Sequence, residues 1–316
     1  MLSFTDILHI LPQQLVFGIT LGTIYGLIAI GYTIVYGVLF MINFAHGDVF
    51  MIGAYVGWTV LGLLLASHAV PLHPAIVLPL MLVSAMLFTG AIGVALERLA
   101  YRPLYRRGAT RLGPLISAIG ASIFLQNAVM LTEGARERVY MTYAVFPRNW
   151  RISIGGINVS VLVIVIACVS GLMMWGLHQI IQRTTLGRNI RAVAEDREIA
   201  AVMGVNVWGV VATAFFIGSA LGGAAGVLVG FYYTQIDFFM GYSAGLKAFT
   251  AAVLGGIGNI RGAMLGGLIL GVIESLATTF INPAFKDAVA FGVLILVLVF
   301  RPGGLLGEAL PDWKKI

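Results

Sequence analysis

Residues 209–233, GVVATAFFIGSALGGAAGVLVGFYY, form a stretch of chain that contains no charged side chain. A helix needs about 20 mostly apolar residues to cross the hydrocarbon core of a bilayer, and this stretch is long enough. Further apolar stretches follow at residues 13–38, 49–70, 74–96, 114–132, 159–181, 245–260, 262–281 and 286–300. The sequence therefore predicts an all-α, polytopic bundle of about eight transmembrane helices, in which either of the two short, glycine-rich stretches beside Arg261 can be re-entrant.

The composition of the 316-residue chain supports a membrane protein. Hydrophobic residues make up 59% of it and charged residues only 10%, whereas soluble domains carry about 25% charged residues. The polar stretches at 98–113, 133–158 and 182–208 are too short to fold on their own, so we expect residues 1–316 to form a single transmembrane domain. The one cysteine, Cys168, excludes an intrachain disulfide and a CxxC metal site, and no metal or cofactor is predicted.

Positive charges gather at the ends of the apolar stretches, which explains the net charge of +6. Lys and Arg are more frequent in cytoplasmic loops than in outer ones. Thirteen of the 19 lie in loop 98–111, in segment 182–208, at Arg261 and in the C-terminal tail. This asymmetry predicts a cytoplasmic C-terminus and an external N-terminus, although four arginines in loop 133–158 run against it. The cations are expected to face the lipid bilayer and not a nucleic acid.

Glycines recur every four residues in two of the apolar stretches, which places them on one face of each helix. They are Gly18, Gly22 and Gly26, and then Gly218, Gly222, Gly226 and Gly230. Such faces let neighbouring helices approach closely, which predicts tight helix packing. A shift of 200 residues is compatible with an inverted repeat, because it superimposes Gly18, Leu21, Gly22, Gly26 and Tyr32 on Gly218, Leu221, Gly222, Gly226 and Tyr232.

The segment Asn43-Phe-Ala-His46-Gly-Asp48 interrupts the apolar sequence between residues 13 and 70. Asn43 is a favourable N-cap residue, and Asp48 suits the positive end of a helix that begins beside it. Two interpretations stay open. The segment is either a capped turn at the membrane surface or a broken helix whose first amides face a polar substrate path.

Two further features interrupt the last third of the chain. Four glycines and one asparagine occur in the eight residues from Gly255 to Gly262, so a helix cannot continue there. Gly255, Gly256, Gly258 and Asn259 form either a plain loop or a second broken-helix element. Glu274 lies in the middle of an apolar stretch, where an acid must face a polar interior. It is predicted either to brace two helices or to contact the substrate path, with Lys247 as its partner.

Segment 182–208 has the pattern of an amphipathic helix with charges of both signs on its polar faces. Thr184 and Thr185 are its candidate caps. Because no transmembrane stretch requires its apolar stripe, we expect that stripe to pack against a soluble partner.

Two enzyme signatures are excluded. Gly241-Tyr-Ser-Ala-Gly245 matches the serine-hydrolase motif G-x-S-x-G, but that motif acts on a strand-to-helix turn of an α/β sheet, and this segment connects two apolar stretches. The sequence contains no G-x-x-x-x-G-K-[ST] phosphate loop, so the chain is not expected to bind ATP in that way.

Several segments together resemble the permeases of branched-chain amino-acid ATP-binding-cassette (ABC) transporters, of the type without an N-terminal extension. The similarity extends over nearly the whole chain. The matching segments are Gly26–Gly37, Asn43–Asp48, Met51–Tyr55, Thr185–Arg188, Arg191–Ala194, Ala200–Val205, Ala251–Asn259 and Arg301–Leu305. In addition, Glu198–Gly204 looks like the E-A-A-x-x-x-G loop of ABC importers, with Ile199 in place of the first alanine.

The resemblance implies a transport subunit without enzymatic activity, in the bacterial cytoplasmic (inner) membrane. It implies four kinds of partner: a second related permease, two cytoplasmic ATPase subunits, a periplasmic or extracellular binding protein, and a branched-chain or related amino acid as substrate. The ATPase would dock on segment 184–206, through Gly187, Arg188, Arg191, Glu198, Ala200, Ala201 and Gly204. The features of the sequence itself, and not the resemblance, make Asn43, His46, Asp48, the glycine segment with Asn259, and Glu274 the candidates for the substrate path.

Three alternatives stay open at this point. Related members of the family carry urea or short amides, usually with a large additional N-terminal region. An ion-coupled secondary transporter would need its own coupling acid, for which Glu274 is the deep candidate. A passive channel for small neutral solutes would need neither ATP nor a partner.

Overall fold

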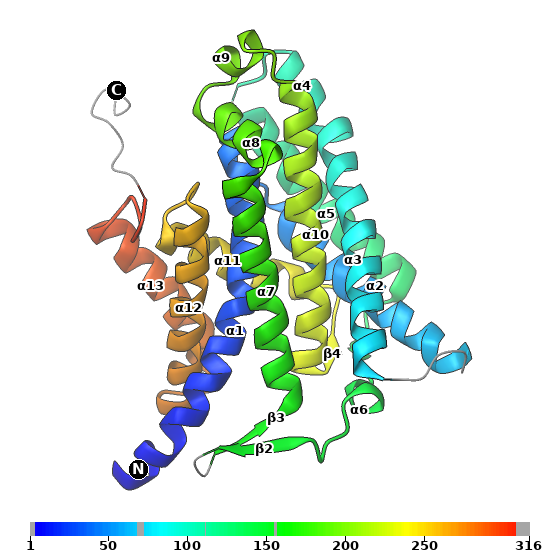
Figure 1. Ribbon diagram of the computed structural model, residues 1–316, viewed down its shortest axis with the longest axis vertical. Helices are drawn as coiled ribbons and strands as arrows, with labels where there is room; N and C mark the ends of the chain where they lie inside the picture. Colours follow the sequence, from blue (N-terminus) through cyan, green and yellow to red (C-terminus); the bar gives the residue numbers. More distant parts are fainter. Residues whose placement is uncertain (1–3, 68–72, 111, 155–156, 308–316) are drawn as a thin grey trace.

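A computed structural model of the chain describes residues 4–67, 73–110, 112–154 and 157–307, which form a bundle of long helices (Figure 1). The long helices are α1 (Phe4–Leu39), α2 (Ala45–Ser67), α3 (Pro74–Leu96), α5 (Leu112–Glu133), α7 (Val161–Arg183), α10 (Val207–Tyr233), α11 (Met240–Gly255), α12 (Ile260–Phe280) and α13 (Lys286–Phe300). The short ones are the π-helix η1 (Glu97–Tyr101), α4 (Arg102–Arg106), α6 (Thr142–Val145), α8 (Thr185–Glu195), α9 (Arg197–Val202) and the 3-10 helix η2 (Pro283–Phe285).

Within these residues, eight helices are long and apolar enough to cross a membrane, as the sequence predicts. The stretch after Arg261 forms one of them, the 21-residue α12, whereas the stretch before it forms the 16-residue α11. At 1.5 Å per residue α11 is about 24 Å long, less than the roughly 30 Å of the hydrocarbon core. The chain is therefore a multi-pass membrane protein in which α11 is the short element beside Arg261.

The loops are divided between two ends of the bundle (Figure 1). Helices α4, α8 and α9 lie together at one end, here called the α8–α9 end. The start of α1, helix α6 and the antiparallel hairpin of β2 (Arg151–Ile154) and β3 (Ile157–Ser160) lie at the other, here called the hairpin end. There β1 (Arg138–Val139) also pairs with β4 (Gln235–Ile236), which ties the loop after α5 to the end of α10. Segment 182–208 and the described part of loop 98–111 thus share one end of the molecule.

Helices α1 and α10 occupy the centre and pack through their glycines, as predicted. A Cβ atom added at Gly22 of α1 would lie 2.7 Å from the Cα of Leu268 in α12. A Cβ added at Gly226 of α10 would lie 2.7 Å from the backbone nitrogen of Ala54 in α2. Both distances are too short for a side chain, so these glycines set the separation of the helices. Helices α1 and α10 run in opposite directions (Figure 1), as an inverted repeat requires, and the repeat itself stays a prediction.

Candidate functional site

The predicted break around Asn43 is present, between the end of α1 at Leu39 and the start of α2 at Ala45. Phe40 has a positive φ of 52°, which is uncommon for a residue other than glycine and turns the chain out of α1. The Asn43 side chain is buried, and its Oδ1 accepts a hydrogen bond from the Tyr101 hydroxyl at 2.8 Å. Asn43 stands two residues before the start of α2, and its side chain fastens the break to η1, the π-helix after α3.

The break begins at the α8–α9 end, where Phe40 is 51% exposed, and leads into the bundle. His46 is fully buried and packs against Gly31, which precedes the end of α1 by eight residues, or about 12 Å of helix. It also faces Gly222, which precedes the end of α10 at Tyr233 by about 16 Å of helix. Because α1 and α10 end at opposite sides of the molecule, His46 lies between the two ends (Figure 1). The depth of His46 fits a helix that begins inside the bundle, and the substrate path beside it stays a prediction.

A second helix begins at the same depth. Helix α11 starts at Met240, and a Cβ added at Gly241 would lie 2.7 Å from the carbonyl oxygen of Gly47 in α2. One added at Gly245 would lie 3.0 Å from the Cα of Gly47. The first turns of α2 and α11, which reach this point from opposite ends of the bundle, thus pack directly on one another. The second break of the chain is consequently the α10–α11 connection.

Polar side chains surround this meeting point. His46 lies edge-on to the Tyr32 ring, with 4.6 Å between ring centroids. Asp48, in the first turn of α2, is buried and accepts a hydrogen bond from the Ser122 hydroxyl of α5. The central polar site is defined here as Asn43, His46 and Asp48 with the first turn of α11.

Glu274 faces the interior and pairs with Lys247, as the sequence predicts. The Lys247 Nζ lies 2.6 Å from Glu274 Oε1 of α12 and 2.7 Å from Asp287 Oδ1 of α13. Lys247 and Glu274 are both buried, whereas the Asp287 side chain is 51% exposed. One ammonium group thus joins three helices. Since a buried charge without a partner is costly, the Glu274 carboxylate depends on Lys247, whereas Lys247 has Asp287 as a second partner.

The glycine segment after α11 forms a tight turn, which matches the plain loop of the two interpretations. Gly256 and Gly258 have φ values of +106° and +94°, in the region that favours glycine. Asn259 caps α12 by accepting a hydrogen bond from the Gly262 amide at 3.1 Å, and it donates one to the Leu306 carbonyl at 2.8 Å. The Leu306 amide in turn donates to the Gly255 carbonyl, so residues after α13 cover the turn.

The amphipathic segment at the α8–α9 end forms two helices where the sequence suggested one. Thr184 caps α8, as predicted, by accepting a hydrogen bond from the Gly187 amide at 3.2 Å. Asp196 adopts an extended conformation, and its carboxylate accepts from the Glu198 and Ile199 amides at 2.8 and 2.9 Å. An aspartate that caps a new helix interrupts the previous one, which is why α8 and α9 are two separate helices.

The prediction that no transmembrane stretch of this chain requires the apolar stripe of this segment is wrong. Ile190, Val193 and Ala200 are buried, and α8 packs against α1, α7 and α10 of the same chain. A stripe at helical spacing shows that one face is covered but does not identify the covering element. The large apolar residues of this segment that are exposed are Ile199, Val202 and Met203, with 63%, 86% and 77% of their surface exposed.

The other residues predicted for ATPase coupling fall into two groups. Gly187 packs against the backbone of Ile181, so it holds α8 on α7. Arg188, Glu198, Ala201 and Gly204 are exposed, and Gly204 has the predicted left-handed conformation with a φ of +84°. Arg191 is exposed as well, and its guanidinium donates a hydrogen bond to the Ile181 carbonyl.

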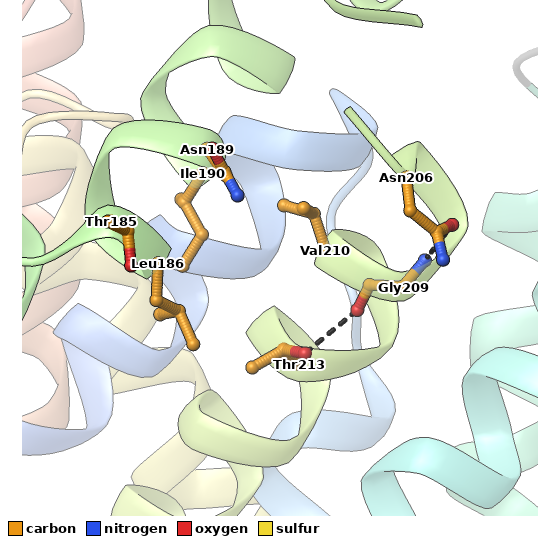
Figure 2. Close-up of a pocket in the computed structure, with 8 residues that line it drawn as sticks. All are labelled: Thr185, Leu186, Asn189, Ile190, Asn206, Gly209, Val210 and Thr213. Carbon is orange, nitrogen blue, oxygen red and sulfur yellow. Dashed lines mark hydrogen bonds between the residues drawn. The ribbon is translucent and has the colours of Figure 1, made fainter. Parts of the chain in front are cut away.

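A cleft of about 340 Å³ lies between α8 and α10, beside the segment (Figure 2). Its walls carry Thr185, Leu186, Asn189 and Ile190 from α8, and Asn206, Gly209, Val210 and Thr213 from the start of α10. Figure 2 shows the Asn206 side chain turned toward the Gly209 amide, which it caps, and the Thr213 hydroxyl bonded to the Gly209 carbonyl. The cleft separates part of α8 from α10.

Comparisons with known proteins agree with this architecture. The chain matches the family described as branched-chain amino acid transport system / permease component over residues 14–298. This chain belongs to that family. The chain is 48% identical over 316 residues to the high-affinity branched-chain amino acid transport system permease protein BraD of Pseudomonas aeruginosa, with 98% of this chain and 99% of that protein covered. It is 44% identical to LivH of Escherichia coli K12, with 96% and 97% covered. No solved structure matches the chain.

A more distant relative is the probable branched-chain amino acid transport permease protein LivH of Methanocaldococcus jannaschii, at 29% identity over 92% of this chain and 90% of that protein. These relatives are named as permeases of transport systems, and the chain is a transport subunit and not an enzyme.

Three residues that contact the predicted site residues were not predicted from the sequence. Tyr101, Ser122 and Asp287 are each the partner of a predicted site residue, and each lies on a different helix from it. Pairing between distant helices leaves no local pattern in the sequence.

Proposed function

We propose that the permease is the membrane-spanning subunit of an ATP-driven importer of branched-chain amino acids. It would act with a second related permease, two cytoplasmic ATPase subunits and an external binding protein. The observation that carries the proposal is the similarity to BraD and LivH over nearly the entire length of both chains. The separation of the α8–α9 end from the hairpin end supports it, since an importer needs one surface for the cytoplasmic ATPases and another for the external binding protein.

The α8–α9 end is proposed to face the cytoplasm, with the N-terminus outside the inner membrane. The arginines of 98–107 and 182–208 support this orientation because their segments lie at that end.

The orientation is tested with single cysteines in a Cys168→Ser background. Asn149 and Arg188 are both exposed, at the hairpin end and in α8 respectively. In intact cells whose outer membrane is permeabilised, a membrane-impermeant thiol reagent is expected to label Asn149→Cys. It is expected to label Arg188→Cys only after lysis. Labelling of Arg188→Cys from outside would refute the orientation.

The substrate path is proposed to pass the central polar site. Asn43, His46 and Asp48 are polar side chains deep among apolar helices, and such residues mark transport routes more often than lipid-facing surfaces. The converging starts of α2 and α11 suit the carboxylate of an amino acid, because both helix ends are positive. These side chains are covered by their own chain, so the path opens only when α2 and α11 separate or when the second permease completes it.

The remaining candidates take supporting places in this proposal. Glu274 and Lys247 hold the part of α11 that follows its first turns, and so fix one wall of the central polar site. The turn that connects α11 to α12 is formed by Gly255, Gly256, Gly258 and Asn259. The pairing of Glu274 with Lys247 also argues against a free coupling acid of an ion-driven transporter.

The ATPase is proposed to dock on the exposed residues of α9 and the turn that follows. Ile199, Val202 and Met203 stand out at the α8–α9 end, and Glu198, Ala201 and Gly204 are exposed among them. Exposed apolar side chains that lie beyond the ends of the spans are stabilised by burial against a protein partner.

The proposed function is tested in cells that lack other uptake systems for branched-chain amino acids. The binding protein, both ATPases and the second permease are expressed with or without this chain. Uptake of labelled leucine is expected only when the chain is present. Equal uptake in its absence would refute the proposal.

A further inference from the structure

Two side chains from other elements hold the end of α1. The last carbonyls of a helix have no partner within it. At the end of α1, the Leu39 carbonyl accepts a hydrogen bond from the Tyr105 hydroxyl of α4 at 2.9 Å. The Val38 carbonyl accepts one from the Arg197 guanidinium of α9. A cation at this position is also favoured by the negative end of the helix. Helix α9 is therefore fastened to the end of α1 through Arg197.

Arg197 also packs between two aromatic rings. Its guanidinium carbon lies 5.9 Å from the ring centre of Phe40 and 5.4 Å from that of Tyr105. The planar guanidinium can stack and donate hydrogen bonds at the same time, which a lysine ammonium cannot do equally well. Phe40 is the residue whose positive φ turns the chain out of α1. Arg197 thus contacts the break itself and not only the helix before it.

The position of Arg197 connects the two functional regions of the permease. On one side it begins α9, whose Ile199, Val202 and Met203 are exposed toward the proposed ATPase site. On the other side it holds Phe40, five residues before α2 begins at Ala45 with the central polar site in its first turn. The buried contacts of α8 through Ile190 and Val193 are apolar and non-directional, and a cleft separates part of α8 from α10 (Figure 2).

We propose that Arg197 is a positioning residue that transmits the movement of α9 to the break between α1 and α2. The guanidinium, held at once by the Val38 carbonyl and the rings of Phe40 and Tyr105, is the directional link between them. When the ATPase displaces α9, this link draws the end of α1 and residues 41–44 with it and shifts the start of α2. This inference rests on the proposed function, because it requires an ATPase on α9. Coupling of this kind runs through contiguous packed and hydrogen-bonded groups.

The test uses the full complex of both permeases and the ATPases in proteoliposomes, with binding protein and leucine outside. Arg197→Gln removes the charge and the stacked plane, and Arg197→Lys keeps only the charge. Arg183→Gln is the matched control, because Arg183 is an exposed arginine at the same end of the bundle. Three quantities are measured: copurified ATPase, ATP hydrolysed, and leucine transported per ATP.

For Arg197→Gln we expect full copurification of the ATPase and continued ATP hydrolysis. Leucine transported per ATP should fall about fivefold or more, the lower range of energetic coupling between distant sites. Arg197→Lys should lie between Arg197→Gln and the parent, and Arg183→Gln should equal the parent. Tyr105→Phe, which removes the hydroxyl bonded to Leu39, should also lower the ratio and serves as the test if Arg197→Gln does not assemble.

A second measurement follows the break directly. With Ile42→Cys in the Cys168→Ser background, the rate of thiol labelling is expected to change when ATP and vanadate are added. The change should disappear in Arg197→Gln. An unchanged ratio of leucine to ATP, or the parental labelling response, would overturn the inference. Selective loss of the ATPase in Arg197→Gln would also overturn it, since Arg197 would then only shape the docking surface. If the parent complex itself binds no ATPase, the proposed function fails instead.

Discussion

Replacing Val202 by glutamate is expected to abolish copurification of the cytoplasmic ATPase with the permease and to stop transport. Val202 is 86% exposed, and with Ile199 and Met203 it forms the apolar tip of the α8–α9 end. An interface anchor of this kind costs about 2 kcal/mol or more on truncation, roughly 30-fold in binding. A carboxylate in its place adds the desolvation of a charge that has no partner. Copurification and uptake measure the two effects.

Two variants control for effects other than docking. Gln182→Glu adds the same charge at an exposed position in the last turn of α7 and should leave copurification unchanged. Gly204→Val should weaken docking by straining the left-handed turn after α9, whereas Gly204→Asn, which tolerates that conformation, should preserve it. Full ATPase copurification with Val202→Glu would mean that the apolar tip is only a solvated surface.

Replacing Lys247 by methionine is expected to reduce the amount of assembled permease in the membrane severely. It leaves the buried Glu274 carboxylate without a cation, and breaking a buried pair in this way costs about 3–5 kcal/mol. Glu274→Gln should be milder, because Lys247 keeps Asp287 as a partner at 2.7 Å. Asp287 is half-exposed and can be solvated when it is alone. The amount of assembled permease is compared among the parent, Lys247→Met and Glu274→Gln by the yield after size-exclusion chromatography in detergent.

The double variant Lys247→Met with Glu274→Gln separates bracing from transport. Neither residue then leaves an unpaired buried charge, so assembly should recover well beyond that of Lys247→Met alone. Uptake per assembled complex should stay below that of the parent, because the pair fixes the wall of the path that α11 provides. Parental uptake per complex in the double variant would show that Glu274 and Lys247 only brace the helices.

The sequence predicted the helices well and their contacts poorly, for a physical reason. A run such as 209–233 has the length and the apolar character that a bilayer requires, and both can be seen in the run itself. The predicted bounds of α10 therefore differ from the observed ones by only two residues. The break near Asn43 was also visible, because polar residues interrupt an apolar run. Its depth was not visible, because depth depends on which turn of α1 and α10 packs against His46. In the same way, the stripe through Ile190 and Val193 was correctly read as buried, but its cover belongs to the permease itself.

The start of α11 illustrates the same limit in another way. Gly241 and Gly245 match a hydrolase motif in the sequence, which the fold excludes. Their place in the structure is a close approach to Gly47, nearly 200 residues earlier in the chain. Such a contact between two glycine-rich turns leaves no pattern in either segment alone. The meeting of α2 and α11 therefore emerges only when the helices are placed in space.

Uptake by purified components tests the central claim most directly. Proteoliposomes would carry this permease and its second permease, with the ATPases and ATP in the lumen and the binding protein outside. Accumulation of labelled leucine, isoleucine or valine is expected only with ATP and the binding protein together, and labelled urea should not accumulate. Equal amino-acid flux without ATP, or failure of the fully assembled complex to accumulate any of the three, would contradict the proposed importer.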